Sequence, residues 1–309
     1  MKLISIVSGC FNEEHNVAEL CTQIDAVFQE LPGYDYEVIL IDNSSTDNTV
    51  EVLREIGSRD HRIKVIVNSR NFGVLRSGSH ALMQAYGDAV IAMASDLQDP
   101  PQLIREFIAK WEEGYKIVLA IKTHSEESRL VYLLRTIYYQ TVKKLADIEL
   151  VAHTTGFGLY DRKVIDVFRQ LNDPYPYFRG LISEIGFEIA KIPFTQPTRK
   201  RGISKSNFYN LYDVAMLGFT SHSKVPLRLA AMLGFAMSLL SLLAAIGYFI
   251  YKLIYWESFP VGQAPIVIGL FLFSSVQLFF IGVVGEYIGA IHTQVLKRPL
   301  VVEKERINF

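Results

Sequence analysis

The stretch AVIAMASDLQDPP at residues 89–101 sets the fold class of this chain. Its first part, Ala89 to Ala94, is a short apolar run, which is typical of a buried parallel strand. Asp96 follows where that strand should end, and ligands of open parallel sheets bind at the carboxyl ends of the strands. Acids before two prolines are also ordinary turn formers, so the stretch by itself supports a ligand site and a turn about equally.

Toward the N-terminus, the same alternation of strand and helix occurs three more times. Short runs rich in β-branched residues predict strands, and apolar residues at helical spacing predict helices. The expected strands are 3–7, 37–42 and 63–67, and the expected helices are 16–30, 47–56 and 77–86. This βαβαβαβ order predicts an α/β fold with a doubly wound, mostly parallel sheet. Asp42 and Asp96 then both lie at carboxyl ends of strands.

Residues 115–200 have a mixed pattern that predicts fewer elements. Apolar runs at 117–120 and 157–160 predict two further strands. Helical spacing predicts helices near 129–145 and 163–171.

Two long apolar stretches dominate the C-terminal third. Residues 229–251 and 258–285 contain no charged side chain. An α-helix rises 1.5 Å per residue, so about 20 residues cross the hydrocarbon core of a bilayer. The pair predicts two transmembrane helices, with a buried helical hairpin in a soluble protein as the alternative.

Positive charges flank the two apolar stretches on one side. Lys224 and Arg228 precede the first stretch, and the cations after the second are Lys297, Arg298, Lys304 and Arg306. The loop between the stretches contributes only Lys252 and Glu257. The positive-inside rule therefore predicts a multi-pass protein of the inner, cytoplasmic membrane, with both termini cytoplasmic and a short external hairpin.

An amphipathic segment lies directly before the first apolar stretch. Its apolar stripe consists of Phe208, Leu211, Tyr212, Ala215, Met216 and Phe219. Such a helix lies in the membrane interface or packs on the soluble domain. The expected divisions are a catalytic domain at 1–205, a juxtamembrane helix at 206–226, a two-helix hairpin at 227–292 and a cytoplasmic tail at 293–309. Small residues at Gly282, Gly285 and Gly289 predict helix packing in a homo-oligomer.

Composition excludes some classes of function. The 309 residues carry a formal net charge of -1, so no global basic field exists to attract a nucleic acid. Cys10 and Cys21 are the only cysteines, which is too few for a disulfide framework or a zinc site and favours a reducing compartment.

Two polar segments can carry chemistry. Asp96 and Gln98 offer a carboxylate and an amide oxygen two residues apart, which suits a hard cation such as Mg²⁺ or Mn²⁺ on a diphosphate. The basic run RKRGISK at 199–205 suits a phosphate clamp. A solvated basic face or a contact with anionic lipid explains the same run.

These pieces occur together with several other short motifs. They are FNE at 11–13, DNSSTDNT at 42–49, NFG at 71–73, DLQDPP at 96–101, RGL at 179–181, RKRGISK at 199–205, SKVPLR at 223–228, GEYIG at 285–289 and RP at 298–299. In this order and spacing they resemble the family 2 glycosyltransferases with the GT-A fold, in particular the polyprenyl-phosphate glycosyltransferases. That group includes bactoprenol glucosyltransferases, the aminoarabinose transferase for undecaprenyl phosphate and dolichol-phosphate mannose synthases. The resemblance covers nearly the whole chain.

The resemblance implies a nucleotide-sugar donor, with a UDP-sugar favoured over a GDP-sugar, and a polyprenyl phosphate acceptor in the membrane. The residues that it places at the nucleotide are Phe11, Glu13, Asp42, Asn71 and Gly73. It implies that Asp96 and Gln98 hold the divalent metal on the diphosphate. The residues that it places at phosphate near the membrane are Arg199, Ser204 and Lys205, with Asp96, Arg199 and Lys205 as the catalytic set.

The chain departs from the family pattern at several positions. Ala94 stands at the first aspartate of the family's D-x-D, Asn43 at the second aspartate of "DDGS" and Ser8 at a usual proline. Where the family often shows "DxGDFRLxDR", residues 153–162 read HTTGFGLYDR, so two acids are missing. A changed donor sugar is our preferred explanation of this altered loop. The acceptor phosphate is largely anionic at neutral pH, so it needs orientation more than a strong general base.

The sequence therefore predicts a membrane-anchored, inverting glycosyltransferase that makes a polyprenyl-phosphate sugar for the cell envelope. One alternative is an enzyme of the same fold that builds a glycan directly, although the "QxxRW" motif of such synthases is absent. The other is a catalytically silent membrane scaffold or nucleotide sensor, which Ala94 favours.

Overall fold

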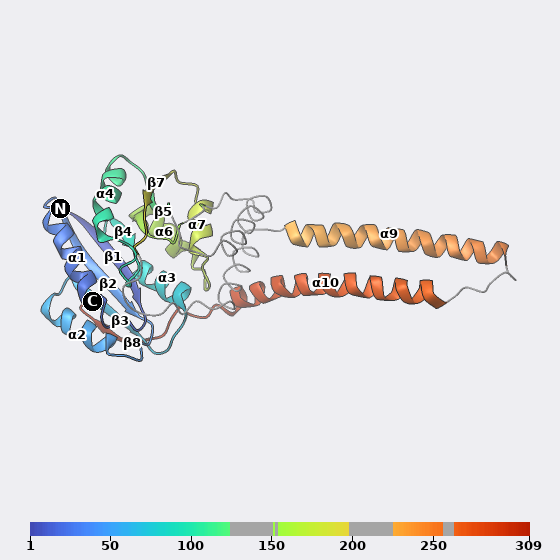
Figure 1. Ribbon diagram of the computed structural model, residues 1–309, viewed down its shortest axis with the longest axis horizontal. Helices are drawn as coiled ribbons and strands as arrows, with labels where there is room; N and C mark the ends of the chain where they lie inside the picture. Colours follow the sequence, from blue (N-terminus) through green and yellow to red (C-terminus); the bar gives the residue numbers. More distant parts are fainter. Residues whose placement is uncertain (124–150, 152–153, 198–224, 256–262) are drawn as a thin grey trace.

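The computed structural model describes residues 1–123, 151, 154–197, 225–255 and 263–309. These residues form an α/β domain from which two long helices extend to one side (Figure 1). The helix expected near 129–145 lies outside the described residues, and so does the segment expected at 206–226 except for its last two residues, which begin α9. The same holds for the expected external loop at 256–262 and for the phosphate-binding residues Arg199, Ser204 and Lys205.

The domain is built on one eight-stranded sheet. Its strands are β1 (Lys2–Cys10), β2 (Tyr34–Asp42), β3 (Ile63–Asn68), β4 (Ala89–Ala92), β5 (Ile117–Lys122), β6 (Gly158–Asp161), β7 (Ile189–Phe194) and β8 (Glu303–Ile307). They lie in the order β7-β5-β6-β4-β1-β2-β3-β8. The strands β4, β1, β2 and β3 are mutually parallel, which confirms the predicted βαβ core.

The sheet as a whole is mixed, although most of its strands run in the same direction. Strand β6 runs antiparallel between β4 and β5, and β8 runs antiparallel to β3 at the edge. Only β5 and β7 add a further parallel pair. Strands β1, β2, β3, β4, β5 and β7 therefore run in the same direction, which confirms a mostly parallel sheet. The sequence did not predict the antiparallel places of β6 and β8, because an antiparallel neighbour needs no crossover helix and leaves no trace in the alternation of strands and helices.

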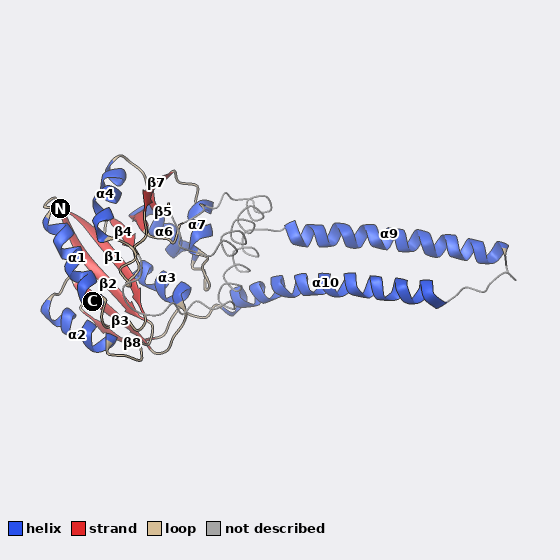
Figure 2. Cartoon of the chain, viewed as in Figure 1, coloured by secondary structure: helices blue, strands red, loops and turns tan. Residues whose placement is uncertain are grey.

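Helices cover both faces of the sheet (Figure 2). They are α1 (Val17–Gln29), α2 (Thr49–Arg59), α3 (Val74–Gln84), the 3-10 turn η1 (Pro101–Leu103), α4 (Ile104–Glu112), α6 (Arg162–Leu171) and α7 (Phe178–Glu184). One buried cluster lies under α1, α2 and α4, and a second lies under α3, α6 and α7. The domain therefore has the three layers typical of α/β folds.

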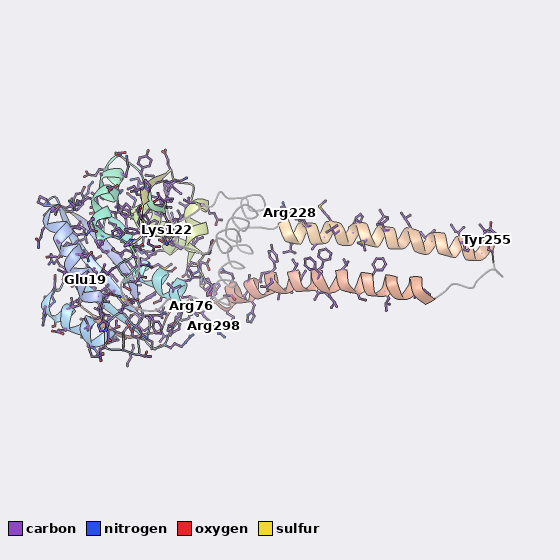
Figure 3. All side chains as sticks on the ribbon, in the orientation of Figure 1. Glu19, Arg76, Lys122, Arg228, Tyr255 and Arg298 are labelled. Atoms are coloured by element: carbon purple, nitrogen blue, oxygen red, sulfur yellow. The ribbon has the colours of Figure 1, made fainter. Side chains whose placement is uncertain are left out.

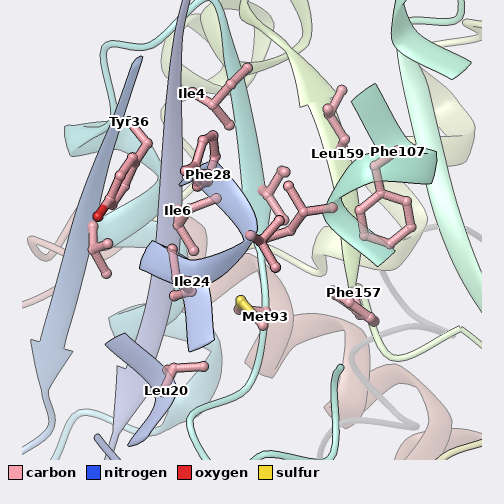
Figure 4. Packing of buried hydrophobic residues seen from close by; sticks show 14 of the residues in the cluster. Ile4, Ile6, Leu20, Ile24, Phe28, Tyr36, Met93, Phe107, Phe157 and Leu159 are labelled. Carbon is pink, nitrogen blue, oxygen red and sulfur yellow. The ribbon is translucent and has the colours of Figure 1, made fainter. Parts of the chain in front are cut away.

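Helix α1 shows how the first cluster forms. Its side chains Leu20, Ile24 and Phe28 recur at helical spacing and are buried against Ile4 and Ile6 of β1 (Figure 4). Each such side chain contributes about 1.5–3 kcal/mol when it is fully buried. This burial holds β1 and the loop that follows it against the rest of the domain.

The two long helices are α9 (Val225–Ile254) and α10 (Gln263–Leu296). Among the described residues, one stretch, Val276–Leu296 of α10, is long and apolar enough to span a membrane, and none of it is buried in the protein. Side chains such as Leu278 and Phe279 lie open to the surroundings, which is unlike the core helix of a soluble domain. The sequence predicted two membrane spans, and among the described residues one helix is long and apolar enough to be a span.

The C-terminal segment after α10 returns to the domain. Strand β8 pairs with β3, and the carbonyl oxygen of Val302 accepts a hydrogen bond of 2.9 Å from the Ser69 N–H. Arg54 on α2 forms a salt bridge of 2.6 Å with Glu305. Residues 293–309, expected from the sequence as a cytoplasmic tail, therefore include the edge strand of the sheet.

Two adjacent valines test the contribution of this return segment. Val301 is 6% exposed, whereas Val302 is 51% exposed. We expect Val301→Ala to lower the free energy of unfolding by about 1–3 kcal/mol, because it leaves a cavity beside the sheet edge. Val302→Ala should stay within about 0.5 kcal/mol of the unmodified chain. Denaturant unfolding in detergent measures both, and equal effects would mean that the segment is not packed as described.

Candidate active site

The carboxyl ends of the parallel strands enclose one large cleft. It has a volume of about 400 Å³. The segments that line it are the loop after β1, the end of β2, the first half of α3, the segment after β4 and the segment before β6. Lining residues with polar or acidic side chains include Glu13, Asn43, Ser77, Asp96 and Asp99. This is the edge at which open α/β sheets bind ligands.

The loops after β1 and β2 are joined by side-chain hydrogen bonds. Asn12 adopts a left-handed conformation with φ 58, and its side-chain oxygen accepts a bond of 2.8 Å from the Thr46 N–H. The Asn12 N–H donates to the Ser45 hydroxyl at 2.9 Å. Asp42 is fully buried and accepts from the Ser45 N–H at 3.0 Å and from the Ser45 hydroxyl. The two loops therefore form one unit at the cleft.

Glu13 is a buried acid on the cleft wall. It is 7% exposed, and its carboxylate accepts a bond of 2.5 Å from the Asn16 side chain. Its backbone N–H donates to the Thr49 hydroxyl at 2.9 Å, which ties the start of α1 to the start of α2. The carboxylate is thereby held at a fixed place in the cleft.

Asn43 connects the end of β2 to the loop after β3. Its amide nitrogen donates to the Asn71 side-chain oxygen at 2.9 Å, and its oxygen accepts from the Phe72 N–H at 2.9 Å. The same Asn71 oxygen accepts from the Gly73 N–H at 2.9 Å. An aspartate at position 43 has no N–H to donate to Asn71. Asparagine at the position of the family's second aspartate therefore provides the N–H group that bonds to Asn71 in the loop after β3.

The segment after β4 turns sharply at its acids. Leu97 has φ 61, and the Asp96 carboxylate accepts a bond of 3.2 Å from the Gln98 N–H. The Gln98 side-chain nitrogen lies 3.4 Å from the carbonyl oxygen of Pro197, which precedes the basic run at 199–205. The Asp99 carboxylate accepts a hydrogen bond of 2.8 Å from the Ala94 N–H, which joins the two ends of this turn.

Asp99 is the acid whose environment is most unusual. It is 4% exposed. Burial raises its pKa to about 6, the Ala94 N–H and Lys122 oppose the shift, and the nearby Asp96 charge adds to it. Asp99 thus lies in the cleft with a pKa that titrates close to physiological pH.

The altered loop before β6 forms part of the cleft wall. Thr155, Gly156 and Phe157 line it, and Gly156 adopts a left-handed conformation with φ 93. Gly158, at the arginine of the family motif, approaches β5 so closely that a Cβ would lie 2.2 Å from the Val118 carbonyl oxygen. No larger side chain fits there without a shift of the backbone. His153 lies outside the described residues.

The structure brings some predicted site residues to the cleft and leaves others beside it. Phe11, Glu13 and Asp96 line the cleft. Those that are described but do not line it are Asp42, Asn71, Gly73 and Gln98. Asp42 and Asn71 instead hold the loops that form the wall. Sequence reasoning gave no role to Asp99 or Asn43, although Asn43 directly follows β2 and Asp99 lies in the segment after β4.

The segment after β4 offers oxygen ligands but no complete metal site. Among the described residues, no group of three His, Cys, Asp or Glu side chains could hold a metal ion. Asp96, Asp99 and the Gln98 amide oxygen suit Mg²⁺ or Mn²⁺, which bind through few protein ligands and complete their shell with phosphate oxygens and water. The residues therefore fit a metal that arrives with a diphosphate.

Comparison with known proteins defines the class. Residues 5–168 match the family model "Glycosyl transferase family 2", and residues 225–291 match "GtrB C-terminal hairpin". The first match covers more than half of the chain, and it spans β1 to β6 with the cleft between them. The chain belongs to glycosyl transferase family 2 and is a glycosyltransferase.

Relatives with the same arrangement match over nearly their full length. The uncharacterised glycosyltransferase YkcC of Bacillus subtilis (strain 168) is 33% identical over 96% of this chain and 92% of that protein. The bactoprenol glucosyl transferase of Shigella phage SfII is 31% identical over 98% of this chain and 97% of that protein. Among solved structures, glucosyl-3-phosphoglycerate synthase from Mycobacterium tuberculosis, in complex with Mn²⁺, UDP and phosphoglyceric acid, matches with TM-score 0.48 and 18% identity over 71% of this chain and 76% of that chain.

The structural role of the Asn43 side-chain amide can be tested by replacing this amide with a carboxylate. We expect Asn43→Asp to lower the free energy of unfolding by about 1–3 kcal/mol at neutral pH, because the Asn71 oxygen loses a donor and a second carboxylate is buried beside Asp42. The matched control is Asn172→Asp at the exposed end of α6, which should change it by less than about 0.5 kcal/mol. Denaturant unfolding compares them, and similar losses at both positions would exclude a special role for Asn43.

The pKa of Asp99 predicts a pH dependence of stability. Its folded value of about 6 exceeds the ordinary 3.8, so the folded protein keeps a proton that the unfolded chain has released between these values. Stability is therefore greatest below the unfolded value and falls, by up to about 3 kcal/mol, as pH rises through the folded value. Asp99→Asn removes this titration and keeps an acceptor for the Ala94 N–H.

The measurement for Asp99 is unfolding in detergent at several pH values from 4 to 8. The free energy of unfolding of the Asp99→Asn variant, relative to that of the unmodified chain, should rise as pH increases toward about 6. A difference that stays constant over this range would show that Asp99 does not titrate there.

Proposed function

We propose that this chain transfers a sugar from a nucleotide-sugar donor to a polyprenyl phosphate in the membrane, with inversion at the anomeric carbon. The observation that supports this proposal most is that one chain contains both a glycosyltransferase cleft and a helix suited to a bilayer. The cleft at the strand ends belongs to a family 2 glycosyltransferase domain, and α10, which follows in the same chain, is apolar and unburied enough to lie in a bilayer. An enzyme built in this way acts on a substrate at the membrane surface.

The relatives support the acceptor. Proteins named bactoprenol glucosyl transferase align with this chain over nearly its whole length, including the C-terminal hairpin. We therefore assign undecaprenyl phosphate as the acceptor class and α9 and α10 as two membrane spans. Both termini are then cytoplasmic, because Arg228, Lys297 and Arg298 flank the hairpin on one side.

The donor is assigned to the cleft. We assign the base and ribose to Phe11 and Glu13, which line the cleft, and Asn43 bonds to Asn71 in the loop that also holds Gly73. A UDP-sugar is the favoured donor, with a GDP-sugar as the alternative. Asp42, fully buried beneath this region, fixes the loop that faces the nucleotide.

The leaving diphosphate needs neutralisation. Asp96 and the Gln98 amide oxygen would hold Mg²⁺ or Mn²⁺, which stabilises the negative charge that develops on the diphosphate. Gln98 also approaches Pro197, two residues before Arg199. We assign Arg199, Ser204 and Lys205 to phosphate near the same end of the cleft. Because the acceptor is already an anion, these residues orient it rather than deprotonate it.

The test is sugar transfer by the full-length chain in detergent, with mass spectrometry of the lipid product from a panel of nucleotide sugars. Asp96→Ala should reduce transfer at least about a hundredfold, because it removes a ligand at the developing charge. Excess chelator should do the same to the unmodified chain. Asp166→Ala, an exposed acid on α6 outside the cleft, is the matched control and should keep full activity.

Three outcomes of this assay are informative. Transfer that is equal with chelator and with Mn²⁺ or Mg²⁺ would exclude the metal role of Asp96 and Gln98. Arg199→Lys and Lys205→Ala within about twofold of the unmodified chain would reduce the basic run to a solvated face, since a lost contact with phosphate should cost about tenfold or more. A lack of transfer with every donor would favour the silent scaffold that Ala94 allows.

A further inference from the structure

Three arginines lie together where α10 meets the domain. Arg70 follows β3, Arg76 lies on α3, and Arg298 follows the last residue of α10, Leu296, by two positions. Figure 3 labels Arg76 and Arg298 at the end of the domain from which the long helices extend. Arg70 and Arg298 are exposed and Arg76 is half-buried. We call these three residues the arginine cluster.

The arginine cluster differs from other arginines of the domain in its partners. Elsewhere, arginines form salt bridges in the pairs Arg54–Glu305, Arg59–Glu55, Arg62–Asp60, Arg105–Glu30, Arg169–Asp166 and Arg306–Glu303. Within the described part of the chain, no carboxylate lies at salt-bridge distance from any member of the cluster. No carboxylate of the described residues therefore neutralises its positive charge.

The hydrogen bonds of the cluster leave donors available. Arg70 donates to the Asn71 carbonyl oxygen at 3.1 Å, and Arg76 donates to the Pro299 carbonyl oxygen at 2.6 Å. The Nε of Arg76 is buried and has no hydrogen-bond partner among the described residues. A guanidinium has five N–H donors, so the described residues accept from only a few of those in the cluster.

The position of the cluster is fixed by rigid contacts. The guanidinium carbons of Arg70 and Arg76 lie 4.0 and 5.2 Å from the centre of the Phe72 ring. The ring orients the two guanidiniums without neutralising them. Arg298 is near enough that its charge, after burial and Arg70, contributes to lowering the pKa of Arg76. Like charges held this close are costly unless an anion lies between them.

The cluster lies outside the cleft lining and beside the segment that follows α10. Leu75 and Ser77 of α3 line the cleft, whereas Arg76 between them does not. Arg76 instead contacts Pro299, which follows the apolar stretch that ends at Leu296. A helix that spans a bilayer up to Leu296 places Arg298 at the depth of the lipid head groups.

We propose that Arg70, Arg76 and Arg298 form a binding site for the phosphate of a membrane lipid. Planar guanidinium forks bind phosphate oxygens in pairs, and three forks from separate elements can surround one phosphate. The bound head group would neutralise the cluster and join the loop after β3 to the end of α10. This site goes beyond the proposed transfer reaction, because it needs no nucleotide sugar and can exist in a protein without transferase activity.

The experiment measures lipid retained by the full-length chain in neutral detergent, by native mass spectrometry. The probes are phosphatidylglycerol, phosphatidylcholine and a short polyprenyl monophosphate, with inorganic phosphate as a competitor. Arg70→Gln and Arg298→Gln should each weaken binding of the anionic lipids about tenfold or more, the cost of losing one charge-assisted contact with a phosphate. Arg70→Lys and Arg298→Lys should also weaken it, because an ammonium cannot replace a planar fork.

Two matched controls separate a site from general surface charge. Arg228→Gln removes one charge at the start of α9, and Arg59→Gln removes one on α2, outside the cluster. Both should bind lipid as the unmodified chain does. A larger loss for polyprenyl monophosphate than for phosphatidylglycerol assigns the site to the acceptor, and equal losses assign it to bulk acidic phospholipid.

Several results would overturn the proposal. One is full binding by the two Lys variants, and another is an equal loss for Arg228→Gln, since each would indicate diffuse charge. Equal retention of phosphatidylcholine would exclude recognition of an anionic head group. Complete displacement by inorganic phosphate at low millimolar concentration would indicate a free-anion site. None of these outcomes depends on whether sugar transfer is detected.

Discussion

The parallel pairing of β1 with both β2 and β4 is the constraint on which the site depends. In this register Cys10 lies opposite Asp42, and Asp42 lies opposite Val67 of β3. Three strands therefore end at the same level of the sheet, and the loops that follow them meet at one edge. Burial of α1 and α3 on opposite faces holds that register, because a slip would expose apolar side chains.

The loops at this edge are held by side chains rather than by regular backbone pairing. Backbone N–H groups that leave a strand need other partners, and Asn12, Asp42 and Asn43 supply them. Residues of this type serve two purposes in the cleft. Some, such as Glu13 and Asp96, line the cleft, and others fix the backbone that positions them. The polar motifs of the chain thus contain both ligand groups and structural groups.

The end of α10 and the cleft are joined through one edge of the sheet. Strand β8 follows α10 and pairs with β3, and β3 leads into the loop that contacts Asn43. His80 of α3 adds a contact of 2.5 Å with Glu303 of β8. Helix α10 and the wall of the cleft are therefore connected by short segments. A lipid bound at the arginine cluster would act on the same connection.

The sequence by itself determined the βαβ core, the apolar helices and the family, because periodicity, length and motif order are local properties of the chain. It also indicated that Phe11, Glu13 and Asp96 belong near a ligand. Only the tertiary structure decided the antiparallel places of β6 and β8, the inward role of Asp42 and the amide bonds of Asn43. These depend on contacts between residues far apart in the chain, and a motif specifies which groups are present but not which of them face the ligand and which face the protein.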